Sequence, residues 1–273
     1  MSTAPTAPDL DAAPQAYYVP LGGGDYRPTL HAQGAWQSHE QHMAPVSGLL
    51  VHCLEAFEPS EHLQIARITF DILGMIGADV THVECRTLRP GRTIRLDEAV
   101  ASVGGRPVVR ATVWRLATAD TTPIAGGGEA LLPGPDQMPE WPGMTSRWAG
   151  GFIASLGART DTPGANGSGR FWIRQSKTIV EGEESTPLAS YVAVVDAMNG
   201  VAPHVEPVDW MFPNTDLTIH LHRPPSSARW VGLATSVTVG ASGLGVTSAV
   251  LHDTSGPIGR AEQILTVRPM PGR

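Results

Sequence analysis

The sequence has 273 residues, of which 41% are hydrophobic and 16% are charged, so it can bury a core and has room for two domains. Its net charge of −7 argues against a nucleic-acid-binding protein, because such proteins carry a basic surface. No stretch approaches the roughly 20 apolar residues of a membrane-spanning helix.

The first 15 residues, MSTAPTAPDLDAAPQ, have neither a basic start nor a hydrophobic run. This pattern is unlike a signal or transit peptide and predicts a disordered leader over residues 1–15. We therefore expect a cytoplasmic protein. The two cysteines, Cys53 and Cys85, lie in separate apolar stretches, which predicts packed thiols rather than a disulfide or a metal site.

The first half of the chain predicts one folding unit over residues 16–133, built as a strand, a helix and an antiparallel sheet. The strand covers residues 16–21 and the helix covers residues 45–57, with Pro45 in its first turn. Four strands follow. One covers residues 78–91, two lie on either side of a Gly-Gly turn at 104–105, and one covers residues 122–132.

The second half, residues 151–273, predicts the same order of elements after a Pro/Gly-rich linker over residues 134–150. A strand-like stretch at 169–177 precedes a helix at 187–199. Strands follow at 215–228, on both sides of a glycine-rich turn, and at 256–267. The chain therefore reads as two copies of one unit.

Two alignments relate the copies. Shifting the helix by 142 positions superposes the apolar stripes and places Asp196 opposite Leu54. For the strands, Asp79 is matched with Asp216, and Pro123 is matched with Pro257. The second of these matches places Glu129 opposite Gln263.

A single helix covered by a long antiparallel sheet is the hotdog arrangement, so the expected fold is an α+β double hotdog. The chain resembles the acyl-CoA thioesterase II family of double-hotdog proteins. The resemblance is carried by TLRPG in the first half, and by FWIR, VVDAMNGVAP, TDLTIHLHRP and AEQ in the second. It implies hydrolysis of acyl-CoA without a cofactor, and a homo-oligomeric assembly.

Asp196 is the first candidate catalytic residue. It lies at the margin of the apolar stripe of its helix, where a solvated acid is the ordinary explanation. The first copy, however, has Leu54 at this position, so the fold accepts an apolar residue there. Since a buried carboxylate costs several kcal/mol unless partners or a raised pKa compensate, its presence indicates a chemical role.

The family resemblance implies two further site residues. Gln263 matches a family glutamine on the last strand, and alternation leaves open whether it or Glu262 points inward. Asn214 stands where the family has a threonine, while Thr215 is the neighbouring hydroxyl and would face the opposite side of the strand. In the family, these three residues hold a water molecule.

The resulting hypothesis is hydrolysis of acyl-CoA by water that Asp196 activates, with no covalent intermediate. The alternatives are a hotdog hydratase or dehydratase and a non-catalytic acyl-thioester-binding protein. The first usually needs a histidine beside the acid, and no histidine is placed beside Asp196 by the sequence. His220 and His222 share a strand face, but a third ligand at metal-site spacing is missing, so we expect no metal.

Overall fold

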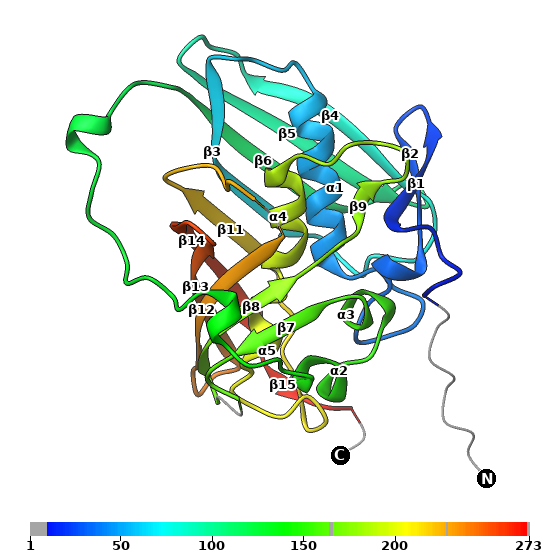
Figure 1. Cartoon of the computed structure of the whole chain (residues 1–273). Coiled ribbons are helices and arrows are strands. Elements are labelled where there is room, and N and C mark those ends of the chain that lie inside the picture. Colours follow the sequence, from blue (N-terminus) through cyan, green and yellow to red (C-terminus); the bar gives the residue numbers. More distant parts are fainter. Residues whose placement is uncertain (1–9, 164–165, 228, 272–273) are drawn as a thin grey trace.

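The computed structural model describes residues 10–163, 166–227 and 229–271. Residues 1–9 of the expected leader therefore lie outside the described residues, and the first strand begins at Ala16. Alternating apolar residues and Gly-rich turns produce an architecture dominated by strands, with two main helices against one curved sheet (Figure 1).

Thirteen strands form a single large sheet in the order β7-β8-β12-β13-β14-β11-β3-β6-β5-β4-β2-β1-β9. Two more strands, β10 (Trp210–Met211) and β15 (Arg268–Pro269), pair separately. The bounds of the large sheet are β1 (Ala16–Gly22), β2 (Asp25–Pro28), β3 (Leu63–Ile72), β4 (Thr81–Arg89), β5 (Ile94–Val103), β6 (Arg106–Ala117), β7 (Gly157–Thr160), β8 (Ser168–Arg174), β9 (Thr178–Val180), β11 (Asp216–Leu221), β12 (Trp230–Val239), β13 (Leu244–Asp253) and β14 (Gly256–Thr266).

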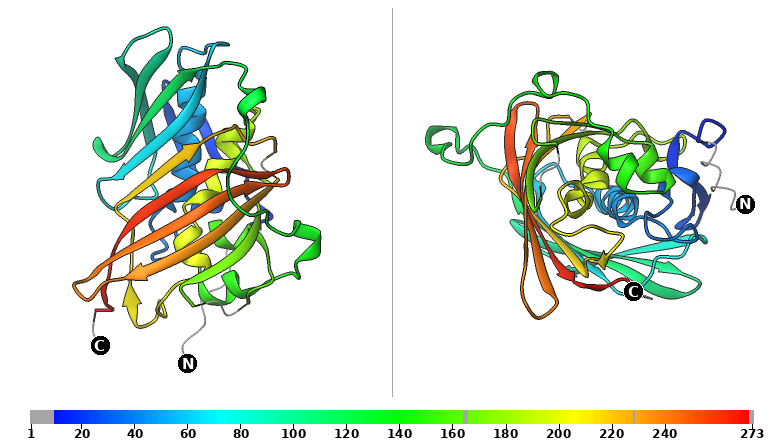
Figure 2. Two further views of the ribbon diagram at one scale, coloured as in Figure 1. Left: turned by 90° about the vertical axis from the view of Figure 1, so that its left-hand side faces the viewer. Right: turned by 90° about the horizontal axis from the view of Figure 1, so that it is seen from below.

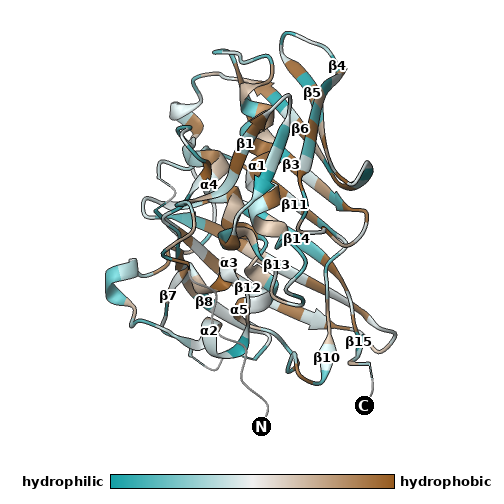
Figure 3. Ribbon diagram, turned by 90° about the vertical axis from the view of Figure 1, so that its right-hand side faces the viewer, coloured by the Kyte–Doolittle hydropathy of each residue, from teal (hydrophilic) through white to brown (hydrophobic). Residues whose placement is uncertain are grey.

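The two main helices are α1 (Met43–Ala56) and α4 (Pro187–Val195). Seen from below, the sheet curves around them (Figure 2), and their ribbons are largely apolar in the hydropathy colouring (Figure 3). The shorter helical segments are η1 (Leu30–Ala32), η2 (Thr122–Ile124), η3 (Pro135–Gln137), α2 (Gly143–Arg147), α3 (Gly151–Ala154) and α5 (Met198–Val201). The expected linker over 134–150 thus contains η3 and α2. None of the described helices is long and apolar enough to cross a membrane.

The order of the strands is symmetric about the centre of the sheet, where β3 pairs antiparallel with β11. On one side follow β6, β5 and β4, and on the other β14, β13 and β12. Each half thus contributes one helix and a matching set of strands, and the two sheets join edge to edge. This arrangement confirms the expected α+β double hotdog, with the helices covering one face of the joined sheet.

The strand alignment drawn from the sequence was wrong by one strand. Ser102 pairs with Pro107 across the β5–β6 hairpin, and His252 pairs with Pro257 across β13–β14, so the strands repeat at a spacing of 150 residues. Asp79 is therefore not the counterpart of Asp216, and Pro123 is not the counterpart of Pro257. Residues 122–132 form η2 and irregular chain rather than a strand. Similar Asp-x-Thr and Pro patterns occur in neighbouring strands, and alternation alone cannot tell these strands apart.

The two helices pack closely where small residues meet. A Cβ added to Gly48 of α1 would lie 2.5 Å from Cβ of Ala193 and 3.1 Å from the carbonyl oxygen of Ala189. The Ser47 hydroxyl also donates to the carbonyl oxygen of Val192 over 3.1 Å. Only glycine permits this approach, which fixes the ends of α1 relative to those of α4.

Candidate active site

Asp196 lies at the C-terminal end of α4 and is 4% exposed, so it is not the solvated acid of the ordinary explanation. The sequence fixes the start of this helix. The Thr186 hydroxyl accepts a hydrogen bond from the Ala189 N–H over 3.0 Å, and Pro187 occupies the first helical turn. The negative end of a helix dipole disfavours a carboxylate, so Asp196 needs compensating contacts.

Two amide side chains supply these contacts. Asn214 Nδ2 and Gln263 Nε2 each donate to Oδ1 of Asp196 over 2.8 Å. Gln263 Nε2 also lies 3.3 Å from the carbonyl oxygen of Asp196. The structure therefore brings the three candidate residues Asp196, Asn214 and Gln263 together, although they are far apart in the sequence.

Gln263 points inward because of its place in β14. Ala261, Gln263 and Leu265 are each 1% exposed, whereas Glu262 is exposed, which resolves the open question of alternation. Oε1 of Gln263 is buried without a hydrogen-bond partner among the described residues. Buried acceptors are normally hydrogen-bonded, and this oxygen lies directly beside Asp196.

Asn214 rather than Thr215 contacts the carboxylate. Asn214 bridges to Leu265 just before β11, and its Nδ2 donates to the carbonyl oxygen of Asp216 over 3.0 Å as well as to Asp196. Thr215 instead donates its backbone N–H to the carbonyl oxygen of Ile264. An asparagine thus occupies the position for which the family resemblance gives a threonine.

His42 is a member of the site that the sequence did not indicate. Its Nδ1 lies 3.5 Å from Oδ2 of Asp196, so the expectation that no histidine lies beside this acid was wrong. His42 caps α1, since its Nδ1 accepts a hydrogen bond from the Ala44 N–H over 3.1 Å. The packing at Gly48 brings the start of α1 to the end of α4. The available signal was a polar residue directly before the first helix, which is a capping position.

Burial has opposite effects on the two titratable groups of the site. It raises the pKa of Asp196 to about 6, although the hydrogen bonds from Asn214 and Gln263 act to lower it. Burial lowers the pKa of His42 to about 4. At neutral pH, Asp196 is therefore ionised and His42 is neutral. Because Nδ1 accepts the helix N–H, the proton of the neutral ring resides on Nε2.

Asp196, Asn214 and His42 line a cleft of about 390 Å³. Met43, the first residue of α1, and Arg268 also line it. Gln263 does not line this cleft, so it supports the carboxylate from behind. Oδ1 of Asp196 is thus held by two amides, while the other carboxylate oxygen is the one nearest His42.

A smaller cavity of about 30 Å³ adjoins the cleft, with His42 and Trp36 lining both. Its other walls include Trp148 and Phe212, whose rings meet that of Trp36 edge-to-face with centroids 5.0 and 5.6 Å away. This volume is about the room that one water molecule takes in the liquid.

Other candidate groups lie outside this site. His220 and His222 line a separate shallow cavity on the surface beside Arg260. Within residues 10–163, 166–227 and 229–271, no group of three or more His, Cys, Asp or Glu side chains is placed to hold a metal ion. Cys53 and Cys85 are free thiols, which confirms that they form no disulfide.

The corrected alignment changes the first-half counterparts of the site residues. With the 150-residue spacing, Gln263 corresponds to Val113 rather than Glu129, which instead pairs with Arg260. Asn214, opposite Leu265, corresponds to Ile65, opposite Arg115. Val113 and Ile65 are both buried apolar residues, as is Leu54, which the helix alignment places opposite Asp196.

Comparisons with known proteins show the family and the fold of the chain. Residues 32–116 match the family model of the acyl-CoA thioesterase N-terminal domain, and residues 128–267 match that of the acyl-CoA thioesterase C-terminal domain. No curated protein matches the sequence.

Several solved structures share the fold at low sequence identity. A candidate thioesterase II from Thermobifida fusca YX is 17% identical, with a TM-score of 0.71 over 98% of this chain and 100% of its own. The acyl-CoA thioesterase II TesB2 from Mycobacterium marinum is 13% identical, with a TM-score of 0.64 over 94% and 97%. A hot dog protein of unknown function from Alicyclobacillus acidocaldarius is 12% identical, with a TM-score of 0.70 over 93% and 97%.

Proposed function

Because the chain belongs to the acyl-CoA thioesterase family, we propose that it hydrolyses acyl-CoA to a free fatty acid and CoA, with Asp196 as the general base. The observation that carries this proposal is the state of the Asp196 carboxylate. It is buried, fixed through Oδ1 by two amides, and part of the cleft wall. A cytoplasmic location and a homo-oligomeric assembly stay predictions from the sequence.

In the proposed reaction, a water molecule in the cleft attacks the thioester carbonyl carbon while Asp196 accepts its proton. Collapse of the tetrahedral intermediate breaks the C–S bond, and the thiolate of CoA takes a proton from Asp196. Atoms and charge balance without a covalent enzyme intermediate. A pKa of about 6 keeps Asp196 ionised at neutral pH and leaves it basic enough to accept a proton.

Asn214 and Gln263 have different parts in this proposal. Asn214 lines the cleft, so its free carbonyl oxygen is available to a water molecule beside Asp196. Gln263 gives its amide hydrogens to Asp196 and fixes the rotamer of the carboxylate. The loss of side-chain entropy that accompanies fixing the Asp196 carboxylate therefore occurs during folding and not during the reaction.

The start of α1 supplies the electrophilic partner in the proposal. The first N–H groups of a helix have no carbonyl partner within the helix, and their end of the dipole is positive. α1 begins at Met43, which lines the cleft opposite the end of α4. Its N–H is suited to polarise the thioester oxygen as negative charge develops there.

The experiment measures thiol release from acyl-CoAs of graded chain length by the wild type and by Asp196→Asn. We expect release by the wild type and a loss of about 10²–10⁴-fold in kcat in the variant. Asp79→Asn, an exposed acid on the surface, is the matched control and should keep full activity. Undiminished release by Asp196→Asn would exclude Asp196 as the base.

The contact between His42 and Asp196 is an observation that favours one alternative function. A histidine beside an acid also suits a hydratase or dehydratase that acts on acyl thioesters. The same proteins are therefore assayed with enoyl-CoA and 3-hydroxyacyl-CoA. Interconversion of these substrates without thiol release would favour this alternative. Binding of acyl-CoA with neither reaction would favour a non-catalytic binding protein.

A further inference from the structure

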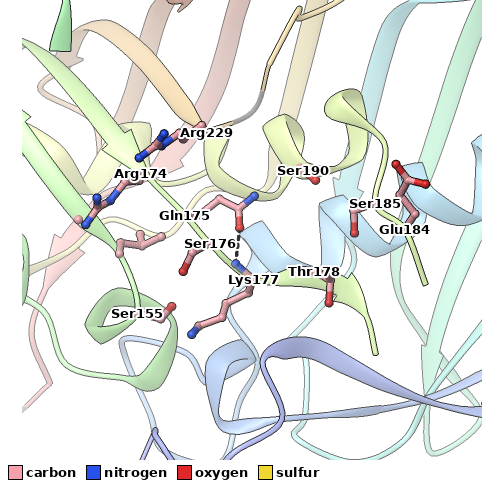
Figure 4. Close-up of a pocket in the computed structure, with 12 residues that line it drawn as sticks. Ser155, Arg174, Gln175, Ser176, Lys177, Thr178, Glu184, Ser185, Ser190 and Arg229 are labelled. Atoms are coloured by element: carbon pink, nitrogen blue, oxygen red, sulfur yellow. Dashed lines mark hydrogen bonds between the residues drawn. The ribbon is translucent and has the colours of Figure 1, made fainter. Parts of the chain in front are cut away.

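A large cavity lies away from the Asp196 cleft, at the start of α4 rather than its end. It has a volume of about 800 Å³, which is in the range of small-molecule sites. Its walls come from the end of β8, the segment leading to β9, the start of α4, the residues after α3, and the residue before β12 (Figure 4). It shares none of its lining residues with the cleft.

Three cations converge on this cavity, although the protein has a net charge of −7. They are Arg174, Arg229 and Lys177, the sole lysine of the sequence. Within the described part of the chain, none of the three forms an ion pair with a carboxylate; Lys177 donates to the neutral side chain of Gln15. Figure 4 shows the two arginines at one end of the cavity and Glu184 at the other.

Two polar side chains of low overall exposure also line the cavity. Ser190 and Gln175 are 7% and 8% exposed. Oε1 of Gln175 accepts the Lys177 N–H over 2.9 Å, but its amide nitrogen and the Ser190 hydroxyl have no partner among the described residues. Both groups face the cavity and are available to hydrogen-bond a polar ligand there.

The chemistry of these walls favours a ligand with phosphate groups. Arginine binds phosphate oxygens through its planar fork of donors, and lysine adds a point charge. Ser190 lies in the first turn of α4, whose positive end also favours an anion. A neighbouring hollow shares Arg174 and Gly157 with the cavity and is walled by Trp141 and Trp230. Its aromatic surface suits a planar ring.

We propose that this cavity, bounded by Arg174, Lys177, Arg229, Gln175 and Ser190, binds a phosphate-bearing ligand of the nucleotide class. Arg174 is held in place because its guanidinium stacks on the Trp230 ring at 5.7 Å. Such a ligand has two possible sources, which share the same chemistry. It is either the nucleotide end of the CoA substrate or a separate phosphorylated metabolite.

The test is calorimetric binding of adenosine 3′,5′-bisphosphate and of inorganic pyrophosphate to the wild-type protein at low and high salt. We expect salt-dependent binding that weakens about tenfold or more in Arg174→Gln and again in Arg229→Gln. Both side chains are exposed, so we expect the substitutions to leave the fold intact. Arg106→Gln, at the exposed first residue of β6, is the matched control and should bind like the wild type. Tighter binding of the nucleotide than of pyrophosphate supports a role for the aromatic hollow.

Binding is measured without turnover, so the outcome is independent of the proposed hydrolysis. If neither probe binds the wild type, or if the arginine variants bind both probes unchanged, the proposal is overturned. The source of the ligand is then determined from the KM values of the variant that carries both Arg174→Gln and Arg229→Gln. A higher KM for acyl-CoA but not for the matching acyl-pantetheine assigns the nucleotide end of the substrate. Unchanged KM values together with lost binding assign a separate metabolite.

Discussion

The C-terminal ends of the two central helices carry opposite charges: an arginine contacts the end of α1, and an aspartate lies at the end of α4. At the end of α1, Arg115 donates to the carbonyl oxygens of Leu54 and Phe57, and it pairs with buried Asp97 over 2.8 Å. A cation at a helix C-terminus is electrostatically favourable. At the end of α4, the chain instead places a carboxylate, Asp196, which is the unfavourable charge.

We infer from this difference that the first half contributes stability, whereas the second half carries the proposed active site. The first-half counterparts of Asp196, Asn214 and Gln263 are Leu54, Ile65 and Val113, all buried and apolar. The scaffold therefore folds without the polar site. An acid at the wrong end of a helix, together with an unsatisfied glutamine oxygen, is a cost that a functional site explains.

The largest effect on stability is expected in the first half. Asp97→Asn leaves Arg95 and Arg115 without their shared carboxylate partner, and their side chains are only 10% and 5% exposed. We expect the free energy of unfolding in urea to fall by about 3–5 kcal/mol.

The control for this loss is Asp71→Asn, which breaks an exposed pair with Arg110 and should cost less than about 1 kcal/mol. The folded fraction of Asp97→Asn should retain its kcat. A large loss of kcat with unchanged stability would show that the first half takes part in the reaction.

In the second half, by contrast, replacing the acid Asp196 is expected to raise the free energy of unfolding. The folded-state pKa of Asp196 is about 6, above its ordinary value of 3.8, so folding favours its protonated form. This group therefore destabilises the protein increasingly as the pH rises from about 4 to 6, and fully above that. Asp196→Asn should be more stable than the wild type at pH 8 by up to roughly 3 kcal/mol.

That gain should shrink to a small fraction near pH 4 and disappear near pH 3, where Asp196 is largely protonated in both the folded and the unfolded states. Urea titrations at these pH values measure it. A variant less stable than the wild type at pH 8 would mean that the carboxylate contributes to the fold, and the contrast between the two helix ends would fail.

Gln263→Val copies the first half, where Val113 occupies the same position. It removes a hydrogen bond that lowers the pKa of Asp196, so this pKa should rise above about 6. We expect about a tenfold loss of kcat. The acid limb of the profile of kcat against pH should move to higher pH. A lower kcat with an unmoved limb would indicate a purely steric effect.

The smallest effect concerns the cap at the start of α1. His42→Ala removes the acceptor for the Ala44 N–H and should lower the free energy of unfolding by about 1 kcal/mol. His42→Asn retains an acceptor at the capping position, so it should keep both stability and most of the activity. If His42→Asn loses as much activity as Asp196→Asn, the imidazole takes part in the chemistry and the dehydratase alternative gains support.

The sequence indicated the residues of the candidate site in two ways, and their catalytic roles stay predictions. Asp196 was singled out because the two helices have distinct, alignable apolar stripes, whereas Gln263 came from the family resemblance and alternation left its face open. Prediction from the sequence failed for the strands, where repeated short patterns allowed a shift by one strand, and for His42, whose neighbour Asp196 is 154 positions away in the sequence.

The sequence alone therefore determined the class of fold, the duplication and the acid, because hydrophobic period and turn chemistry are local properties. Only the tertiary structure decided which residues surround that acid. The approach of α1 and α4 at Gly48 brings His42 to Asp196, and the pairing of β11 with β14 brings Asn214 beside Gln263. The same packing also gathers Arg174, Lys177 and Arg229 around one cavity, since contacts between distant segments depend on packing rather than on local pattern.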